Sequence, residues 1–239
     1  ALLLAATASA LARSAAAVDR AALDLARSAV TADDARRRAA IEGLIARGRP
    51  DIVAVLIDLM LYFPDDGDLL AAALRRFTGQ PIGTDWFRWM LWQEEAPQIR
   101  PFDGYGLFKA RLLAEMDPAF AEFLPEGVRH AIRLEEIVWG GVARDGIPAL
   151  TAPAFVAARE ASWLWDGEPV FGVAIGGVVR AYPHRIMDWH EMANDTVGGV
   201  PLALAYCTLC GSGVLYETSV AGRAAPFEFG SSGLLYRSN

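Results

Sequence analysis

Cysteine, histidine and lysine are all scarce in this chain of 239 residues, which contains two cysteines and three histidines and has Lys109 as its one lysine. The two cysteines, Cys207 and Cys210, form a single Cys-x-x-Cys motif with no second motif of this kind elsewhere in the sequence. A metal ion bound there would therefore take its remaining ligands from histidine, carboxylate or solvent. Neither standard glycine-rich phosphate-binding loop occurs, so no motif predicts a nucleotide site.

The sequence is acidic overall, with a formal net charge of −7, and has no long basic segment. The densest basic run is the three arginines at 36–38, and Asp33, Asp34 and Glu42 balance it on the same stretch. Proteins that bind nucleic acid usually carry a basic patch or stripe. We therefore expect no nucleic-acid partner and interpret residues 36–38 as a solvated helix face.

The apolar stretch at the beginning of the sequence, residues 1–12, is shorter than the roughly 20 residues that span a bilayer. The Ala-x-Ala pattern at 8–10 resembles the end of a secretory signal. Three interpretations stay open: the tail of a longer anchor helix, a signal remnant, or the first turns of an ordinary helix. Two of the three place the folded part outside the cytoplasm, so the predicted location is extracytoplasmic (periplasmic), with membrane anchoring at the N-terminus as one form of it.

Before about residue 145 glycine is sparse and hydrophobic residues recur with a helical period. Residues 31–34 predict a helix cap, residues 51–63 predict a helix buried on nearly all sides, and Gly79 predicts a helix C-cap. Helices that alternate with tight turns in this way are similar to HEAT-like helical hairpins. We therefore predict an α-helical region over residues 1–134.

Three tryptophans, Trp86, Trp89 and Trp92, recur every third residue on one of the predicted helices. A stripe of this kind usually belongs to a core or to the seam between domains. The alternative is an exposed hydrophobic surface that contacts a protein partner or the membrane interface.

The later part of the chain is rich in glycine and β-branched residues. Glycine pairs at 176–177 and 198–199 predict turns between short strands, and two further strands are expected around 221–222. Residues 184–195 have helical spacing, and Asn194 and Asp195 predict an Asx turn that ends this helix. The predicted fold class is α+β, with a helical N-terminal region followed by an antiparallel β-rich domain with one inserted helix over residues 135–239.

The Cys-x-x-Cys motif has several chemical interpretations. In thioredoxin such a motif opens a helix, which lowers the thiol pKa, whereas residues 211–217 predict a turn and a strand. Two cysteines in a tight turn between strands are typical of a metal knuckle. A thiol–disulfide pair and inert buried thiols are the alternatives. The candidate ligands for zinc or copper are Cys207, Cys210 and His190, with His184, Glu191 and Asp195 as additional candidates.

Four sequence blocks, DGIP, WHEMANDTVGG, YCTLCGS and FGSSGLLY, resemble the bacterial family of unknown function DUF3179. The resemblance covers about residues 135–239 and implies membership of the family without an established reaction. The family pattern usually has an apolar residue where His184 stands, so His190 is the favoured histidine. The pattern also continues beyond Asn239, so we expect this domain to be incomplete at its C-terminus.

The first functional hypothesis is an exported metal-binding or thiol-redox domain built on a Cys-x-x-Cys and histidine site, with no specific reaction assigned. The second is a non-catalytic scaffold or accessory subunit of a larger membrane-associated complex. In that case Trp86, Trp89, Trp92 and the apolar N-terminus contact the partners, and the cysteines only brace a turn.

Overall fold

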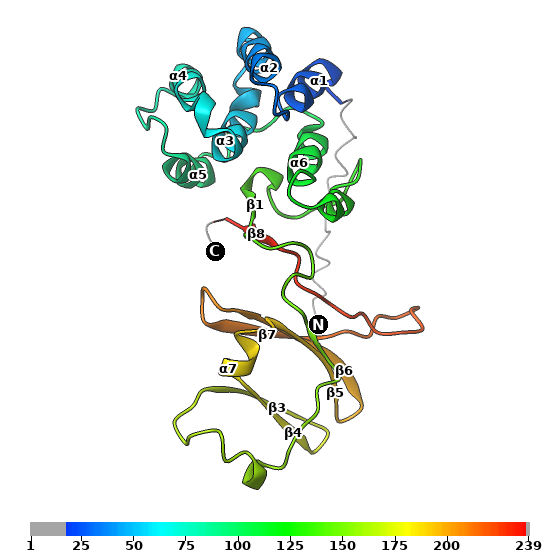
Figure 1. Ribbon diagram of the computed structural model, residues 1–239. Helices are drawn as coiled ribbons and strands as arrows, with labels where there is room; N and C mark the ends of the chain where they lie inside the picture. Colours follow the sequence, from blue (N-terminus) through cyan, green and yellow to red (C-terminus); the bar gives the residue numbers. More distant parts are fainter. Residues whose placement is uncertain (1–17, 238–239) are drawn as a thin grey trace, which may run out of the picture. The chain divides into compact units, whose positions relative to one another are not determined.

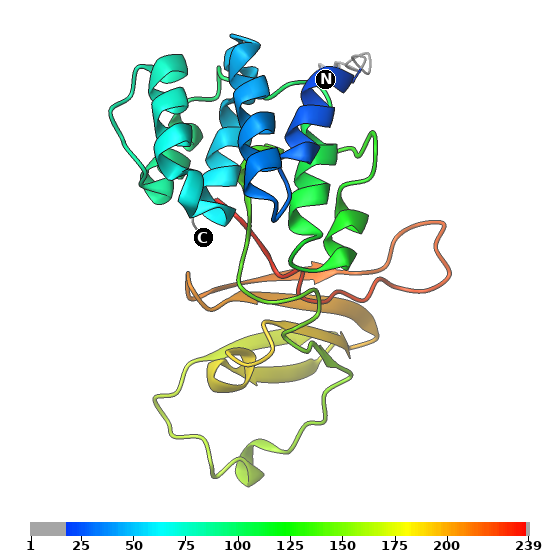
Figure 2. The same cartoon turned by 45° about the horizontal axis from the view of Figure 1, so that its top comes forward.

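The structure is a computed structural model that describes residues 18–237 (Figures 1 and 2). The described residues fall into two compact units. The helical unit runs to Ala114 and also includes Ala121–Glu135, and the β-rich unit consists of Glu115–Phe120 and the residues from Glu136 onwards. The predicted apolar N-terminal stretch lies outside the described residues. No helix within residues 18–237 is both long and apolar enough to cross a bilayer.

The helical unit contains six α-helices among the described residues, and short 3-10 helices precede two of them at Pro50–Ile52 and Pro64–Asp66. Other 3-10 turns lie at Pro118–Phe123, Leu134–Glu136 and, in the β-rich unit, Ala158–Glu160. The α-helices are α1 (Arg20–Ser28), α2 (Asp34–Ala46), α3 (Val53–Tyr62), α4 (Gly67–Thr78), α5 (Trp86–Glu95) and α6 (Tyr105–Leu113).

Helix α3 is the centre of this unit, and every residue from Val53 to Met60 in it is buried. This confirms the prediction of a helix buried on nearly all sides. The two predicted helix caps are also confirmed. At the start of α2 the carboxylate of Asp33 accepts a hydrogen bond from the Arg36 N–H, and at the end of α4 Gly79 has a φ of 75°. Helix α1 packs against α2 and α3 against α4. The HEAT-like character of this arrangement stays a prediction.

The tryptophan stripe lies on α5, where its three members have different environments. Trp89 is fully buried, its indole N–H donates to the Gly83 carbonyl at 2.7 Å, and its ring meets the Trp92 ring edge-on. Trp86 and Trp92 are half-buried. Trp89 is therefore a core residue, and contact with a partner through Trp86 and Trp92 stays a prediction.

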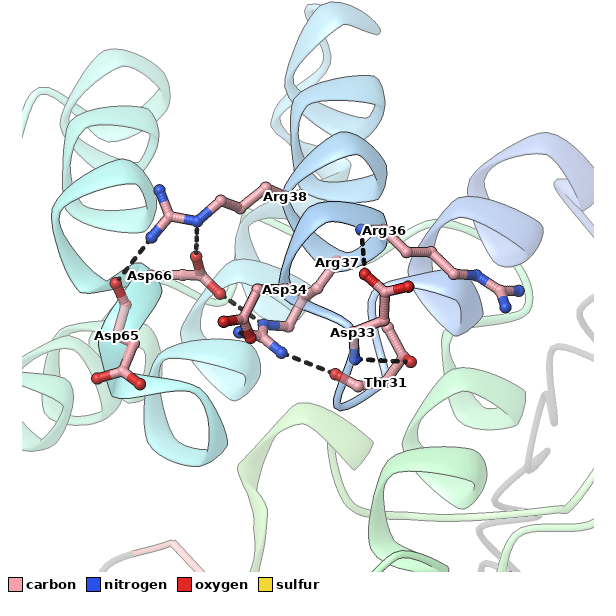
Figure 3. Close-up of polar contacts among 8 residues, drawn as sticks. All are labelled: Thr31, Asp33, Asp34, Arg36, Arg37, Arg38, Asp65 and Asp66. Atoms are coloured by element: carbon pink, nitrogen blue, oxygen red, sulfur yellow. Dashed lines mark hydrogen bonds and ion pairs between the residues drawn. The ribbon is translucent and has the colours of Figure 1, made fainter.

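The sequence predicted that the basic run 36–38 forms a solvated helix face. This is wrong for Arg37, which is only 4% exposed. Its guanidinium binds Asp66 at 2.5 Å, Asp34 at 2.6 Å and the Thr31 carbonyl at 2.8 Å (Figure 3). The Asp66 carboxylate, buried in the turn before α4, also pairs with Arg38 at 2.8 Å. Local sequence could not predict this network because its acidic and basic members come from turns and helices that only the tertiary fold brings together.

A second buried polar cluster lies between α3 and α6. The Lys109 ammonium lies 2.6 Å from one oxygen of Asp58, and the Tyr105 hydroxyl donates to the other oxygen at 2.5 Å. Burial and the neighbouring Asp58 carboxylate raise the pKa of Tyr105 well above its ordinary value. The tyrosine is therefore neutral in the folded protein at pH values where an unfolded tyrosine would ionise.

This raised pKa predicts a loss of stability in alkali. The folded state retains the Tyr105 proton above about pH 10, where the unfolded chain releases it, so the stabilisation is complete below that pH and falls as the pH rises. We expect this residue to lower the free energy of unfolding by up to about 1.4 kcal/mol per pH unit. Urea unfolding followed by far-ultraviolet circular dichroism measures the slope.

Tyr105→Phe should remove this part of the alkaline slope while costing about 1–2 kcal/mol at neutral pH, because Asp58 loses a donor. Tyr216→Phe is the control, since Tyr216 is exposed in the β-rich unit. Identical slopes for wild type and Tyr105→Phe would contradict the prediction.

The β-rich unit is built mainly on antiparallel pairs. Its central sheet has the order β2-β5-β6-β7, in which only the short β2–β5 pair is parallel, while β3 pairs with β4 and β1 with β8. The strands are β1 (Ile137–Trp139), β2 (Leu150–Thr151), β3 (Val170–Ile175), β4 (Val178–Pro183), β5 (Met192–Val197), β6 (Val200–Cys207), β7 (Ser212–Glu217) and β8 (Leu234–Tyr236), with the one-turn helix α7 (His184–Met187) between β4 and β5. The α+β class is confirmed, as are the turns at 176–177 and 198–199.

Three local predictions for this unit were wrong. The helix predicted over 184–195 ends at Met187, and Met192–Val197 form β5, because pairing with the long strand β6 overrides the weak helical spacing. Asn194 consequently lies in a strand instead of an Asx turn, and its amide makes two hydrogen bonds to the Phe229 backbone, at 2.8 and 2.9 Å. The strand expected after 221–222 does not form; β8, which pairs with β1, begins only at Leu234.

The core of the β-rich unit positions the segments that carry the cysteines. It includes Val173 and Tyr182 from the β3–β4 hairpin, Met187 from α7, and Leu204 and Tyr206 from β6. Alternate residues of β5 and β6 reach this core, which fixes the register of the two strands. The end of β6 is therefore held in place next to α7 and the start of β5.

Candidate functional site

Cys207 and Cys210 lie at the tip of the β6–β7 hairpin. Cys207 is the last residue of β6 and pairs with Ser212, the first residue of β7. Gly211 closes the turn with a φ of 61°, a conformation that glycine adopts without steric cost. The two cysteines are joined by a disulfide, with their Cα atoms 5.5 Å apart. The motif is thus followed by a strand, as the sequence analysis predicted, and it does not open a helix.

The two sulfur atoms have different surroundings. Cys207 is half-buried and its Sγ accepts a hydrogen bond from the Cys210 backbone N–H at 3.3 Å. Cys210 is exposed, and the Ser212 hydroxyl donates to its Sγ at 3.5 Å. Leu209, between them, is 71% exposed. A reagent from solvent therefore reaches Cys210 more easily than Cys207.

Glu191, in the bend just before β5, contacts the end of β6 and the cysteine turn. Its backbone carbonyl accepts from the Tyr206 N–H at 2.8 Å, and its carboxylate accepts from the Thr208 hydroxyl at 3.0 Å. Its φ of 54° is rare for a residue with a side chain and costs about 1 kcal/mol or more. This strained backbone conformation lies where the chain turns from α7 into β5.

The other predicted ligands are engaged elsewhere. His190 has its Nδ1 2.7 Å from the Pro148 carbonyl oxygen, and because a carbonyl only accepts, we assign the proton to Nδ1. The His184 ring stacks on Phe171 at 4.3 Å between ring centres. Asp195 accepts from the Tyr182 hydroxyl at 2.7 Å.

These placements do not assemble the predicted ligand set. Within residues 18–237, no group of three or more histidine, cysteine, aspartate or glutamate side chains has an arrangement that would hold a metal ion. The structure brings together Cys207, Cys210 and, through Thr208, Glu191. It does not add His190, His184 or Asp195 to them. A metal site would therefore need the disulfide to be reduced and at least one further ligand to move.

Two functional neighbours were not found from the sequence. Thr208 occupies a variable position of the Cys-x-x-Cys motif, so no spacing rule singles it out. Burial and a hydrogen bond to Asp188 raise the pKa of Tyr206, which keeps this neighbour of Cys207 neutral. Only the pairing of β5 with β6 places Glu191 and Tyr206 opposite each other.

Part of the chain matches a known protein family. The family model described as "Protein of unknown function (DUF3179)" matches residues 144–239, which include every cysteine and every candidate ligand discussed above. No curated protein and no solved structure matched the chain. Residues 144–239 therefore form a DUF3179 domain.

Proposed function

We propose that the DUF3179 domain carries a reversible dithiol–disulfide site at Cys207 and Cys210. The observation that carries the proposal is the disulfide at an accessible hairpin tip, in which one sulfur is exposed and the other accepts a backbone N–H. A buried structural disulfide would lack this accessibility. Labile and regulatory disulfides are typically the exposed ones.

The asymmetry of the two sulfurs suggests an order of events. The thiolate of an external dithiol attacks the Sγ of Cys210 and forms a mixed disulfide, while Cys207 leaves as a thiolate with the electron pair of the broken S–S bond. The Cys210 N–H, which points at this sulfur, stabilises the departing thiolate. The second thiol of the reductant then displaces Cys210 and closes the reductant's own disulfide. The cysteine pair gains two electrons and, after protonation, two protons.

Thiol titration tests the proposal. We expect no reactive thiol in the protein purified without reductant, two after treatment with a dithiol, and none again after an oxidised dithiol is added. Equilibration with dithiol buffers of graded potential should give one two-electron transition. Cys210→Ser should leave one thiol, that of Cys207, which reacts slowly because it is half-buried. A pair that stays closed in excess dithiol while the domain is folded would overturn the proposal.

A metal knuckle is the second candidate, and the N–H···S hydrogen bond together with Gly211 favours it, because both are what a thiolate pair needs in a tight turn. In the reduced state Cys207 and Cys210 would hold zinc or copper, with His190 or Glu191 as the further ligand. Elemental analysis of the reduced protein distinguishes the two candidates. About one equivalent of metal that protects both thiols until chelation would favour the metal, and metal-free thiols would favour the redox pair.

The proposal extends to the cellular location of the protein and to its protein partners. Disulfides form and persist in oxidising compartments, so we propose an extracytoplasmic site of action. As an accessory subunit, the protein would contact a membrane-associated complex through α5, where Phe87 and Leu91 are exposed beside the half-buried Trp86 and Trp92. In that case the cysteine pair would regulate or brace the subunit.

A further inference from the structure

A second feature of the β-rich unit lies apart from the cysteines: an open cavity of about 910 Å³. One wall is the segment 153–166, and the other is formed by β4 and α7. In Figure 2 this segment runs as a wide loop beside the β3–β4 hairpin. The volume is at the upper end of the range that holds one small organic molecule. Neither cysteine contributes to the lining described by the structure.

The cavity has an unusually apolar rim for a surface loop. Trp163 is 47% exposed and Trp165 is 63% exposed, and Val156 and Val179 are also exposed. All four line the cavity. Core packing does not account for two tryptophans that face water from one loop, whereas an apolar ligand that covers them does.

One cation, Arg180, lies in this apolar lining, and no hydrogen bond joins its side chain to another residue within 18–237. Its guanidinium lies 4.0 Å from the centre of the Phe155 ring, and its Nε is buried with no hydrogen-bond partner among the described residues. Stacking on an aromatic face leaves the N–H groups at the edge of the guanidinium available. Arg180 is half-buried, and a guanidinium in such a place is stabilised best by a carboxylate or phosphate that accepts two parallel hydrogen bonds.

The carboxylates near the cavity do not pair with the Arg180 guanidinium, so it is available to an anion. The other charged residues that line the cavity are Arg159, which pairs with exposed Glu160 at 3.3 Å, and exposed Asp166. Asp195, next to the cavity residue Tyr182 in space, is already engaged by the Tyr182 hydroxyl. The lining therefore presents the Arg180 guanidinium within a large apolar surface.

From these contacts we propose that the cavity binds an amphipathic carboxylate, with the carboxylate on Arg180 and an alkyl or aromatic body against Trp163 and Trp165. The apolar surface supplies affinity and the single guanidinium selects the anionic end group. This site is independent of the dithiol–disulfide proposal, since it uses neither sulfur.

Tryptophan fluorescence and calorimetric titration of the full chain with sodium decanoate test the proposal, with decanol and decyltrimethylammonium as neutral and cationic analogues. We expect saturable binding of one decanoate, at least about tenfold tighter than decanol and with no binding of the cation. Arg180→Gln should weaken decanoate about tenfold or more and leave decanol unchanged. Arg223→Gln, which removes the same charge from an exposed position away from the cavity, should change neither.

Trp163→Ser is the second variant, and because this side chain is half exposed the substitution should not disturb folding. It should weaken decanoate and decanol alike. If Arg180→Gln does not fold, the preference of the wild type for decanoate over decanol decides the question. Absence of decanoate binding, equal affinity for the two ligands, or unchanged affinity in a folded Arg180→Gln variant would each overturn the proposal.

Discussion

Lys109→Met is expected to lower the free energy of unfolding of the helical unit by about 3–5 kcal/mol, the largest effect of any single substitution considered for this protein. Lys109 is 1% exposed, and its ammonium lies 2.6 Å from the Asp58 carboxylate. Burial raises the pKa of Asp58, and the positive charge of Lys109 is the main influence in the opposite direction. Without it, the buried carboxylate keeps, of its hydrogen-bond partners in the part of the chain that the structure describes, only the Tyr105 hydroxyl.

The pH dependence makes this prediction specific. In Lys109→Met the folded-state pKa of Asp58 should rise further above its unfolded value, so the folded state binds a proton that the unfolded chain has lost. Stability then falls as the pH rises between these two pKa values, and the cost of the substitution should be smaller at pH 5 than at pH 8. Urea unfolding followed by far-ultraviolet circular dichroism, which reports mainly the helices, measures the difference at both pH values.

Two controls accompany this variant. Arg75→Met removes a charge from an exposed position on α4 and should change stability by no more than about 0.5 kcal/mol. The double variant Asp58→Asn with Lys109→Met should cost less than the sum of its two single substitutions, since neither partner is left as an unpaired charge. Additive costs, or a Lys109→Met cost that does not depend on pH, would contradict a paired buried charge.

Asp66→Asn should have the second largest effect and destabilise the helical unit by about 3 kcal/mol. The Asp66 side chain is fully buried and pairs with both Arg37 and Arg38 (Figure 3). Asparagine keeps the shape but removes the charge, which leaves the buried guanidinium of Arg37 with only the exposed carboxylate of Asp34 and a backbone carbonyl. Thermal and urea unfolding of the variant measure the loss.

Asp65→Asn is the matched control because it is the same substitution one residue earlier. The Asp65 side chain is exposed, and Arg38 binds its backbone carbonyl, which the substitution retains. We expect a change within about 0.5 kcal/mol. The Asp66→Asn loss should also persist in high salt, because buried pairs are screened far less than exposed ones. Equal effects at the two positions would show that burial of Asp66 is unimportant.

The candidate site was predictable where its signal is local. The spacing of Cys207 and Cys210 identifies them as a Cys-x-x-Cys motif. The residues after Cys210, beginning with Gly211, predict a turn and then a strand. The placement of His190 was not predictable, because the helical spacing of 184–195 predicted a helix there. In the structure the helix ends at Met187, and His190 lies in the turn before β5 with its Nδ1 near the Pro148 carbonyl.

The sequence by itself determined the features that depend on short-range pattern. These are the α+β class with helices first, the almost completely buried helix α3, the αL cap at Gly79 and the glycine turns of the β-rich unit. Each follows from periodicity or from a residue's own backbone preference, which neighbouring residues in the chain are sufficient to express.

Only the tertiary structure decided the features that depend on residues far apart in the chain. Pairing with β6 turned the helical pattern of 192–195 into strand, and the packing of α2 beside the turn before α4 buried Arg37 with Asp66. The same is true of Glu191 beside the cysteine turn and of Arg180 in an apolar cavity. At these positions burial and hydrogen bonding between distant residues contribute more free energy than local conformational preference. A local sequence pattern therefore does not predict them.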